Sequence, residues 1–127
     1  MLCLELDDFS PRNVFYGNPI KNNIITNGAF NYIHYTTHDY SLNIIYLHLP
    51  TEKGAFTAET IQKVKRIEQE LLNSSKTKQL KITQCLYSQH IDGPVILKIS
   101  GVWETDTACG VTFKIIHLPK NAKVRFQ

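Results

Sequence analysis

Lysines and aromatic residues recur on neighbouring extended segments of this chain, and together they could bind a polyanion. From Pro94 to Leu118 the sequence alternates apolar and polar residues on both sides of a short polar connector, which predicts a β-hairpin. Lys98 and Lys114 fall on the polar side of its two arms. Cations that neutralise phosphates, beside flat rings on which bases stack, are what an unpaired nucleic-acid strand requires.

The candidate contacts come from several segments. The cationic candidates are Lys81, Lys98, Lys114, Lys120, Lys123 and Arg125. The ring candidates are Tyr32, Tyr35, Tyr46 and Tyr87, of which Tyr35 and Tyr87 are taken as site residues. Trp103 and Phe113 fall in register with the apolar side of the hairpin, which begins at Val95, so we expect both rings in the core.

Length and composition indicate one domain, residues 1–127, with 43% hydrophobic and 20% charged residues. The net charge of +3 is unevenly spread along the chain. Residues 1–60 hold 3 basic and 6 acidic side chains, whereas residues 61–127 hold 11 basic and 5 acidic ones. The basic half contains the predicted hairpin, which is compatible with a polyanionic partner.

Apolar runs and cysteines bear on the compartment. The run from Leu42 to Leu49 is far shorter than the roughly 20 residues that cross a bilayer, so we expect neither a membrane span nor a secretory signal. Cys3, Cys85 and Cys109 are scattered and lack CxxC spacing, which is typical of reduced, partly buried thiols. We therefore expect an intracellular protein, cytoplasmic or nuclear, in a host cell if the chain is viral.

Catalytic and metal-binding patterns are missing from the sequence. Glu104 and Asp106 form an acidic pair in a turn, but no Gly-x-Ser-x-Gly motif, phosphate-binding glycine loop or Cys/His nucleophile pair accompanies them. His34 and His38 are four residues apart in a segment that indicates a strand, where this spacing does not bring two imidazoles to one ion. We expect no metal, no cofactor and no enzymatic activity.

Hydrophobic periodicity predicts an α+β, mostly β domain with one helix. Thr57 is a suitable N-cap, and apolar residues recur at helical spacing from Ile61 to Leu72, which predicts a helix over about 58–73. Strands are predicted at Leu2–Leu6, Ile24–Thr37 around an Asn27-Gly28 turn, Leu42–Leu49, Leu80–Tyr87, both arms of the hairpin and Lys123–Phe126. One helix inserted between antiparallel strands fits either a small OB-like barrel or a curled sheet with the helix on one face.

Three segments resemble single-stranded DNA-binding proteins of large DNA viruses. They are YSLNIIYLHL (Tyr40 to Leu49), KVKRIEQELL (Lys63 to Leu72) and ILKISGVWETDTACGVTFKIIHL (Ile96 to Leu118). In the last segment, GVW and GVTFK look similar to the C-terminal strand pair of that family, and the likeness covers about the last two thirds of the chain. The resemblance implies an OB-fold and a non-enzymatic role in holding single-stranded DNA during replication or recombination. Because the turn carries Glu104 and Asp106, we expect the strand faces to contact the DNA.

A second interpretation belongs to another class: a structural or protein-interaction β domain, capsid-associated or self-assembling. Exposed strand edges and the aromatic-rich segment from Phe30 to Tyr46 would then pair with another chain. The sequence leaves open the oligomeric state, a homo-oligomer included, and whether RNA is bound as well as DNA.

Overall fold

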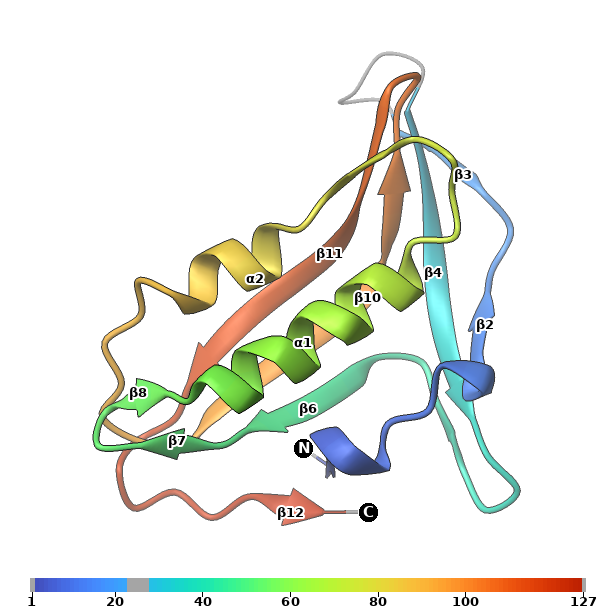
Figure 1. Ribbon diagram of the computed structural model, residues 1–127. Helices are drawn as coiled ribbons and strands as arrows, with labels where there is room; N and C mark the ends of the chain where they lie inside the picture. The colour runs from blue at the N-terminus through green and yellow to red at the C-terminus, as the bar shows by residue number, and fades with distance from the viewer. Residues whose placement is uncertain (1, 23–27, 127) are drawn as a thin grey trace.

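The computed structural model describes residues 2–22 and 28–126, in which one curled sheet wraps around a helix (Figure 1). The strands are β1 (Leu2–Glu5), β2 (Val14–Tyr16), β3 (Ile20–Asn22), β4 (Gly28–Thr36), β5 (Ser41–Leu42), β6 (Ile45–Leu49), β7 (Thr51–Glu52), β8 (Ala55–Phe56), β9 (Thr77–Gln79), β10 (Val95–Glu104), β11 (Ala108–His117) and β12 (Arg125–Phe126). The helices are α1 (Ala58–Leu71) and α2 (Lys81–Leu86), with the 3-10 turns η1 (Leu6–Asp8) and η2 (Pro11–Asn13). The predicted class, α+β and mostly β with a curled sheet and one main helix, is confirmed.

Strand β10 is the centre of the main sheet. Antiparallel β11 lies along one edge of β10, while the other edge is shared: β6 pairs with residues 95–99 and β4 with residues 101–104. Beyond this shared edge β4 diverges from β6 and pairs with β2 and β5. The divergence curls the sheet, and Figure 1 shows α1 and α2 on the same side of it.

Helix α1 forms where the sequence predicts it. The hydroxyl oxygen of Thr57 accepts a hydrogen bond from the backbone N–H of Thr60 at 3.1 Å, which satisfies a free donor of the first turn. Its buried apolar stripe is Ile61, Val64, Ile67 and Leu71. This stripe packs against the sheet side chains Ile45, Leu47, Leu49, Val95, Leu97 and Ile99, so one face of the sheet carries the core.

A β-bulge interrupts β10 at Ser100. Ile99 lies opposite Phe113 and Gly101 lies opposite the adjacent Thr112, so one residue of β10, Ser100, has no partner in β11. One extra residue reverses which side chains face the core, because side chains alternate strictly along a strand.

The bulge moves Trp103 to the face of the sheet opposite the core. Val102 packs against the core cluster, and Trp103 lies opposite Gly110 on the other face. The expectation that Trp103 shares the core face with Val95 was therefore wrong, since it assumed unbroken alternation. Phe113, which precedes the bulge in the ladder, packs against the core as expected.

The predicted strand Leu80–Tyr87 was wrong, because these residues form α2. The buried carboxylate of Glu68 in α1 accepts hydrogen bonds from the backbone N–H groups of Ile82 and Thr83 at 2.9 and 3.0 Å, and from the Thr83 hydroxyl at 2.7 Å. An anion that binds the free N–H groups at a helix start stabilises the helix. A contact from another part of the chain thus outweighs the β-branched composition of the segment.

Other segments follow the prediction with small differences. The predicted strand Leu42–Leu49 is divided into β5 and β6, and a last short strand, β12, is confirmed. The Asn27 side of the predicted turn lies outside the described residues, and Gly28 begins β4. No helix in residues 2–22 and 28–126 has the length and apolarity needed to cross a membrane.

Candidate nucleic-acid interface

Two lysines meet on the sheet face that α1 and α2 leave uncovered. Lys98 of β10 lies directly opposite Lys114 of β11, and on its other side it lies opposite Tyr46 of β6. Residues directly opposite one another in a sheet share a face, with Cβ atoms about 4.5–5.5 Å apart. Lys114 is exposed, and Lys98 and Tyr46 are half-buried.

Three aromatic rings continue this face beyond the bulge. Trp103 lies opposite Phe30 of β4, and Tyr32 of β4 lies opposite Gly101. The Tyr32 side chain is 50% exposed, and its ring meets that of Phe30 edge-on, with ring centroids 4.8 Å apart. We call the surface formed by Phe30, Tyr32, Tyr46, Lys98, Trp103 and Lys114 the open sheet face.

Two glycines allow these rings to lie close to the backbone. A Cβ atom on Gly110 would come within 2.5 Å of the Trp103 indole, and one on Gly101 would come within 2.4 Å of both the Phe30 ring and the Asn31 carbonyl oxygen. Aromatic rings thus occupy the space above both glycines. A ring packed on backbone in this way has little freedom and can leave its outer side to a ligand.

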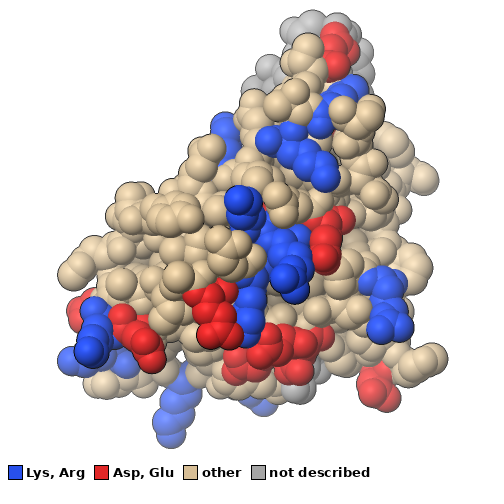
Figure 2. All heavy atoms as spheres, in the orientation of Figure 1, with Lys and Arg blue, Asp and Glu red and all other residues tan. Residues whose placement is uncertain are grey.

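The two lysines of the open sheet face differ electrostatically from those on the helix side. Lys63 pairs with Asp7 at 2.8 Å and Glu59 at 3.1 Å, and hydrogen bonds to these carboxylates raise the pKa of its ammonium group. Basic and acidic side chains are interspersed on the helix-bearing face (Figure 2). Lys98 and Lys114, by contrast, form no ion pair with any described residue. Like charges directly opposite in a sheet are destabilising, so an anion bound between them would relieve repulsion.

The other predicted site residues do not lie on this face. Lys81 begins α2 and Tyr87 follows it, 70% exposed, so both belong to the helix side of the sheet. Tyr35 is 1% exposed in the core, stacks on Phe9, and its hydroxyl accepts the backbone N–H of Ser10 at 2.9 Å. A base could not stack on Tyr35 in this arrangement.

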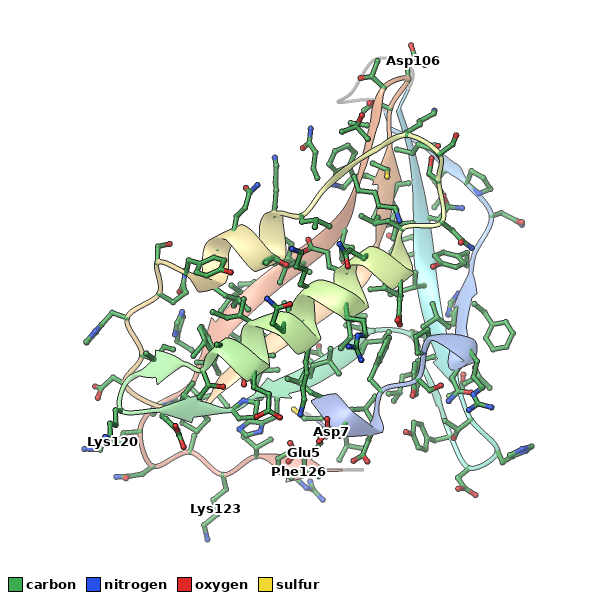
Figure 3. All side chains as sticks on the ribbon, viewed as in Figure 1. Glu5, Asp7, Asp106, Lys120, Lys123 and Phe126 are labelled. Atoms are coloured by element: carbon green, nitrogen blue, oxygen red, sulfur yellow. The ribbon has the colours of Figure 1, made fainter. Side chains whose placement is uncertain are left out.

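The C-terminal cations lie at an edge of the molecule. Figure 3 shows Lys120 and Lys123 on the segment that leads to β12, with Lys123 pointing away from the protein. Arg125 lies in β12, opposite Leu2 of β1. Of the six predicted cations, the structure therefore brings only Lys98 and Lys114 into direct opposition.

Sequence reasoning missed Phe30 and Trp103 and did not select Tyr32. The available signal was the pair of glycines, Gly101 and Gly110, on either arm of a hairpin rich in large side chains, because a glycine inside a strand marks a bulge or a close approach. The sequence does not show which residue of the strand forms the bulge.

The described residues offer little other chemistry. None of their His, Cys, Asp and Glu side chains form a group of three that could hold a metal ion. Cys3 and Cys109 are buried free thiols, and burial raises the pKa of each. Comparisons with protein-family models, with curated proteins and with solved structures found no match to this chain.

Proposed function

We propose that this protein is a non-enzymatic module that binds single-stranded DNA through the open sheet face and acts in replication or recombination. The observation that carries the proposal is the meeting of Lys98 and Lys114 with the rings of Tyr32 and Trp103 on one uncovered face. Phosphates would lie over the lysine pair and bases over the rings. The role in replication or recombination rests on the resemblance of the sequence to viral single-stranded DNA-binding proteins.

The free energies expected from stacked bases and neutralised phosphates are large enough for useful affinity. Each base stacked on an aromatic side chain contributes about 1–3 kcal/mol. Each phosphate neutralised on a single strand contributes a slope of about −0.7 to the dependence of log affinity on log salt concentration. A short unpaired strand across this face should therefore bind in low salt and dissociate as salt rises.

Fluorescence anisotropy with labelled oligonucleotides tests the proposal. The expected result is binding of single strands in preference to duplex, and an RNA of the same sequence shows whether ribose is accepted. Replacing both Lys98 and Lys114 by Ala should weaken binding of all sequences alike and make the salt slope shallower by about 1.4. Absence of single-strand binding in low salt would refute the function.

A matched control separates the open sheet face from general basic charge. The double variant Lys81→Ala, Lys123→Ala removes the same charge from the helix side and from the C-terminal segment. It should bind nearly as well as the unaltered protein. If the two double variants lose affinity equally, the interface includes the other predicted cations and is not confined to the open sheet face.

A second candidate, a protein-interaction or self-assembling domain, is favoured by exposed apolar side chains near the same face. Phe15 of β2 is 56% exposed and Ile20 of β3 is 49% exposed. Phe15 lies opposite His34 and Ile20 lies opposite Phe30 of β4, so both share the face that carries Tyr32, and a contiguous exposed apolar patch marks an interaction surface. Light scattering coupled to size-exclusion chromatography of nuclease-treated protein tests this candidate, which requires a defined oligomer without affinity for single strands.

A further inference from the structure

A pocket of about 400 Å³ lies on the helix side, where the C-terminal end of α1 meets β4 and β10. Its lining includes Tyr16, Asn31, Leu72, Ser74, Val102 and Glu104. Val102 and Glu104 alternate with Trp103 on β10, so their side chains lie on the core side of the sheet. The pocket therefore lies on the core side of the sheet and shares only Trp103 with the open sheet face.

The charge of the pocket is balanced. One carboxylate oxygen of Glu104, Oε1, accepts the Ser74 hydroxyl at 2.8 Å and pairs with Lys76 at 3.3 Å. These hydrogen bonds, that from Ser74 first, hold the pKa of Glu104 below its usual value, so the carboxylate is ionised at neutral pH. Since Lys76 supplies the opposite charge, the pocket favours a neutral ligand over an ion.

The hydrogen-bonding groups that remain include acceptors on Glu104 and Asn31, while the Asn73 amide and the Ser75 hydroxyl supply donors. Glu104 Oε2 and Asn31 Oδ1 accept no hydrogen bond from a described residue, because the only bonds of these side chains use Oε1 and Nδ2. The Tyr16 hydroxyl donates to the Leu71 carbonyl oxygen at 2.6 Å. The lone pairs of the Tyr16 oxygen can therefore still accept a hydrogen bond. A ligand that pairs with the free oxygen of Glu104 must present a hydrogen-bond donor.

The walls combine polar groups with apolar and aromatic side chains. Leu71, Leu72 and Val102 supply aliphatic surface, and the half-exposed Tyr16 supplies a ring. A flat heterocycle suits such walls, as when an unpaired base is held between apolar side chains and its Watson–Crick edge is read by hydrogen bonds. Carboxylates accept hydrogen bonds from exocyclic amino groups of bases.

We propose that this pocket binds an amino-bearing nucleobase, namely adenine, cytosine or guanine, with its amino group donating to Glu104. Thymine lacks an exocyclic amino group, and its N3–H lies between two carbonyl oxygens that would face the carboxylate unfavourably. The pocket can bind the base of a free nucleoside or of a strand. This binding does not depend on strand binding by the open sheet face.

Titration calorimetry with adenosine, cytidine, guanosine and thymidine at millimolar concentrations tests the proposal. At least one amino-bearing nucleoside should bind at least tenfold more tightly than thymidine, because the carbonyl oxygens on both sides of the thymine N3–H would be repelled by the carboxylate. Backbone amide shifts in NMR spectra should change at Asn31, Ser74 and Glu104. Absence of binding by every nucleoside, or equal binding of thymidine, would overturn the proposal.

Two variants locate the site. Glu104→Gln should reduce the affinity for amino-bearing nucleosides at least tenfold. It should also lower the ratio of their affinity to that of thymidine. Ser75→Trp alters an exposed lining residue that makes no hydrogen bond to a described residue, and its indole should obstruct the pocket without loss of the fold. Undiminished binding by folded Ser75→Trp protein would refute the site even if Glu104→Gln failed to fold.

Two further experiments distinguish a failure of this inference from a failure of the proposed function. The variant Lys98→Ala, Lys114→Ala should retain nucleoside binding while it loses affinity for single strands. A short cytidine-containing oligonucleotide, compared with cytidine alone, shows whether the base is taken from a strand. Loss of nucleoside binding in the lysine variant would place the ligand on the open sheet face and contradict the pocket assignment.

Discussion

The buried carboxylate of Glu68 in α1 binds the first turn of α2 by accepting both the backbone N–H and the hydroxyl of Thr83. Glu68 is 1% exposed, and it accepts a third hydrogen bond from the N–H of Ile82. A buried anion is tolerated when its lone pairs are satisfied in this way. The carboxylate thus replaces the capping side chain that Leu80 cannot supply, since no side-chain cap is formed there.

Removing this carboxylate should destabilise the protein strongly. Glu68→Ala leaves three buried donors without their acceptor, and we expect a loss of about 3–5 kcal/mol in the free energy of unfolding. Glu68→Gln keeps one acceptor oxygen, so its loss should be smaller. Urea unfolding followed by circular dichroism measures both variants. The exposed Glu70 of the same helix is the control, because Glu70→Ala should change stability by less than about 0.5 kcal/mol, and equal losses at the two positions would contradict this account.

Helix α2 shows which part of the fold the sequence could not predict. The segment from Leu80 contains Ile82 and Thr83, whose β-branched side chains favour a strand locally. Its helical state depends on Glu68, which lies well before it in the chain and is recognisable as its cap only once the two helices are packed together. Helix α1, in contrast, has its N-cap Thr57 and its apolar stripe within one continuous segment, and its prediction was accurate.

The candidate site, like the fold, was predicted correctly only in part. Alternation along the two hairpin arms correctly placed Lys98 and Lys114 on one face, because the ladder is regular between Val95 and Ile99. Beyond Ile99 the bulge reverses the alternation, so the same rule misplaced Trp103. A periodicity argument holds only as far as the register is unbroken, and one inserted residue is invisible to it.

The contact between Ser74 and Glu104 should be visible in a pH titration. The hydrogen bond from Ser74 lowers the pKa of Glu104 from the ordinary value of 4.5. A carboxyl group whose pKa is lower in the folded state contributes stability above its unfolded pKa, and this contribution is lost as pH falls through the folded pKa. In a ¹³C NMR titration, Ser74→Ala should move the Glu104 midpoint upward. Ser75→Ala, the neighbouring control, should leave it in place, and an unchanged midpoint in Ser74→Ala would show that the bond does not cause the shift.

The close approach of Trp103 to Gly110 predicts a spectroscopic effect. A methyl group at position 110 would come within 2.5 Å of the indole, so Gly110→Ala should displace the ring, shift tryptophan emission to longer wavelength and cost about 1–3 kcal/mol of stability. The chain holds one Trp, which makes the assignment unambiguous. Gly17→Ala is the control for the emission, because the nearest neighbours of a Cβ there belong to Tyr32 and His34 and not to the indole. Unchanged emission from Gly110→Ala would show that the indole does not cover this glycine in solution.

Two exposed tyrosines on opposite sides of the sheet test whether bases stack on the open sheet face. Tyr32 is 50% exposed beside Phe30, while Tyr87 is 70% exposed at the end of α2. Loss of a stacking contact of about 1–3 kcal/mol corresponds to about 5- to 150-fold weaker binding, which we expect for Tyr32→Ala with a single-stranded oligonucleotide. Because a stacked ring is neutral, the salt slope should stay the same, whereas the lysine variants should change it.

Tyr87→Ala should bind normally, since Tyr87 adjoins neither Lys98 nor Lys114. A larger loss for Tyr87→Ala than for Tyr32→Ala would move the bases to the helix side and leave the lysine pair without a role in binding.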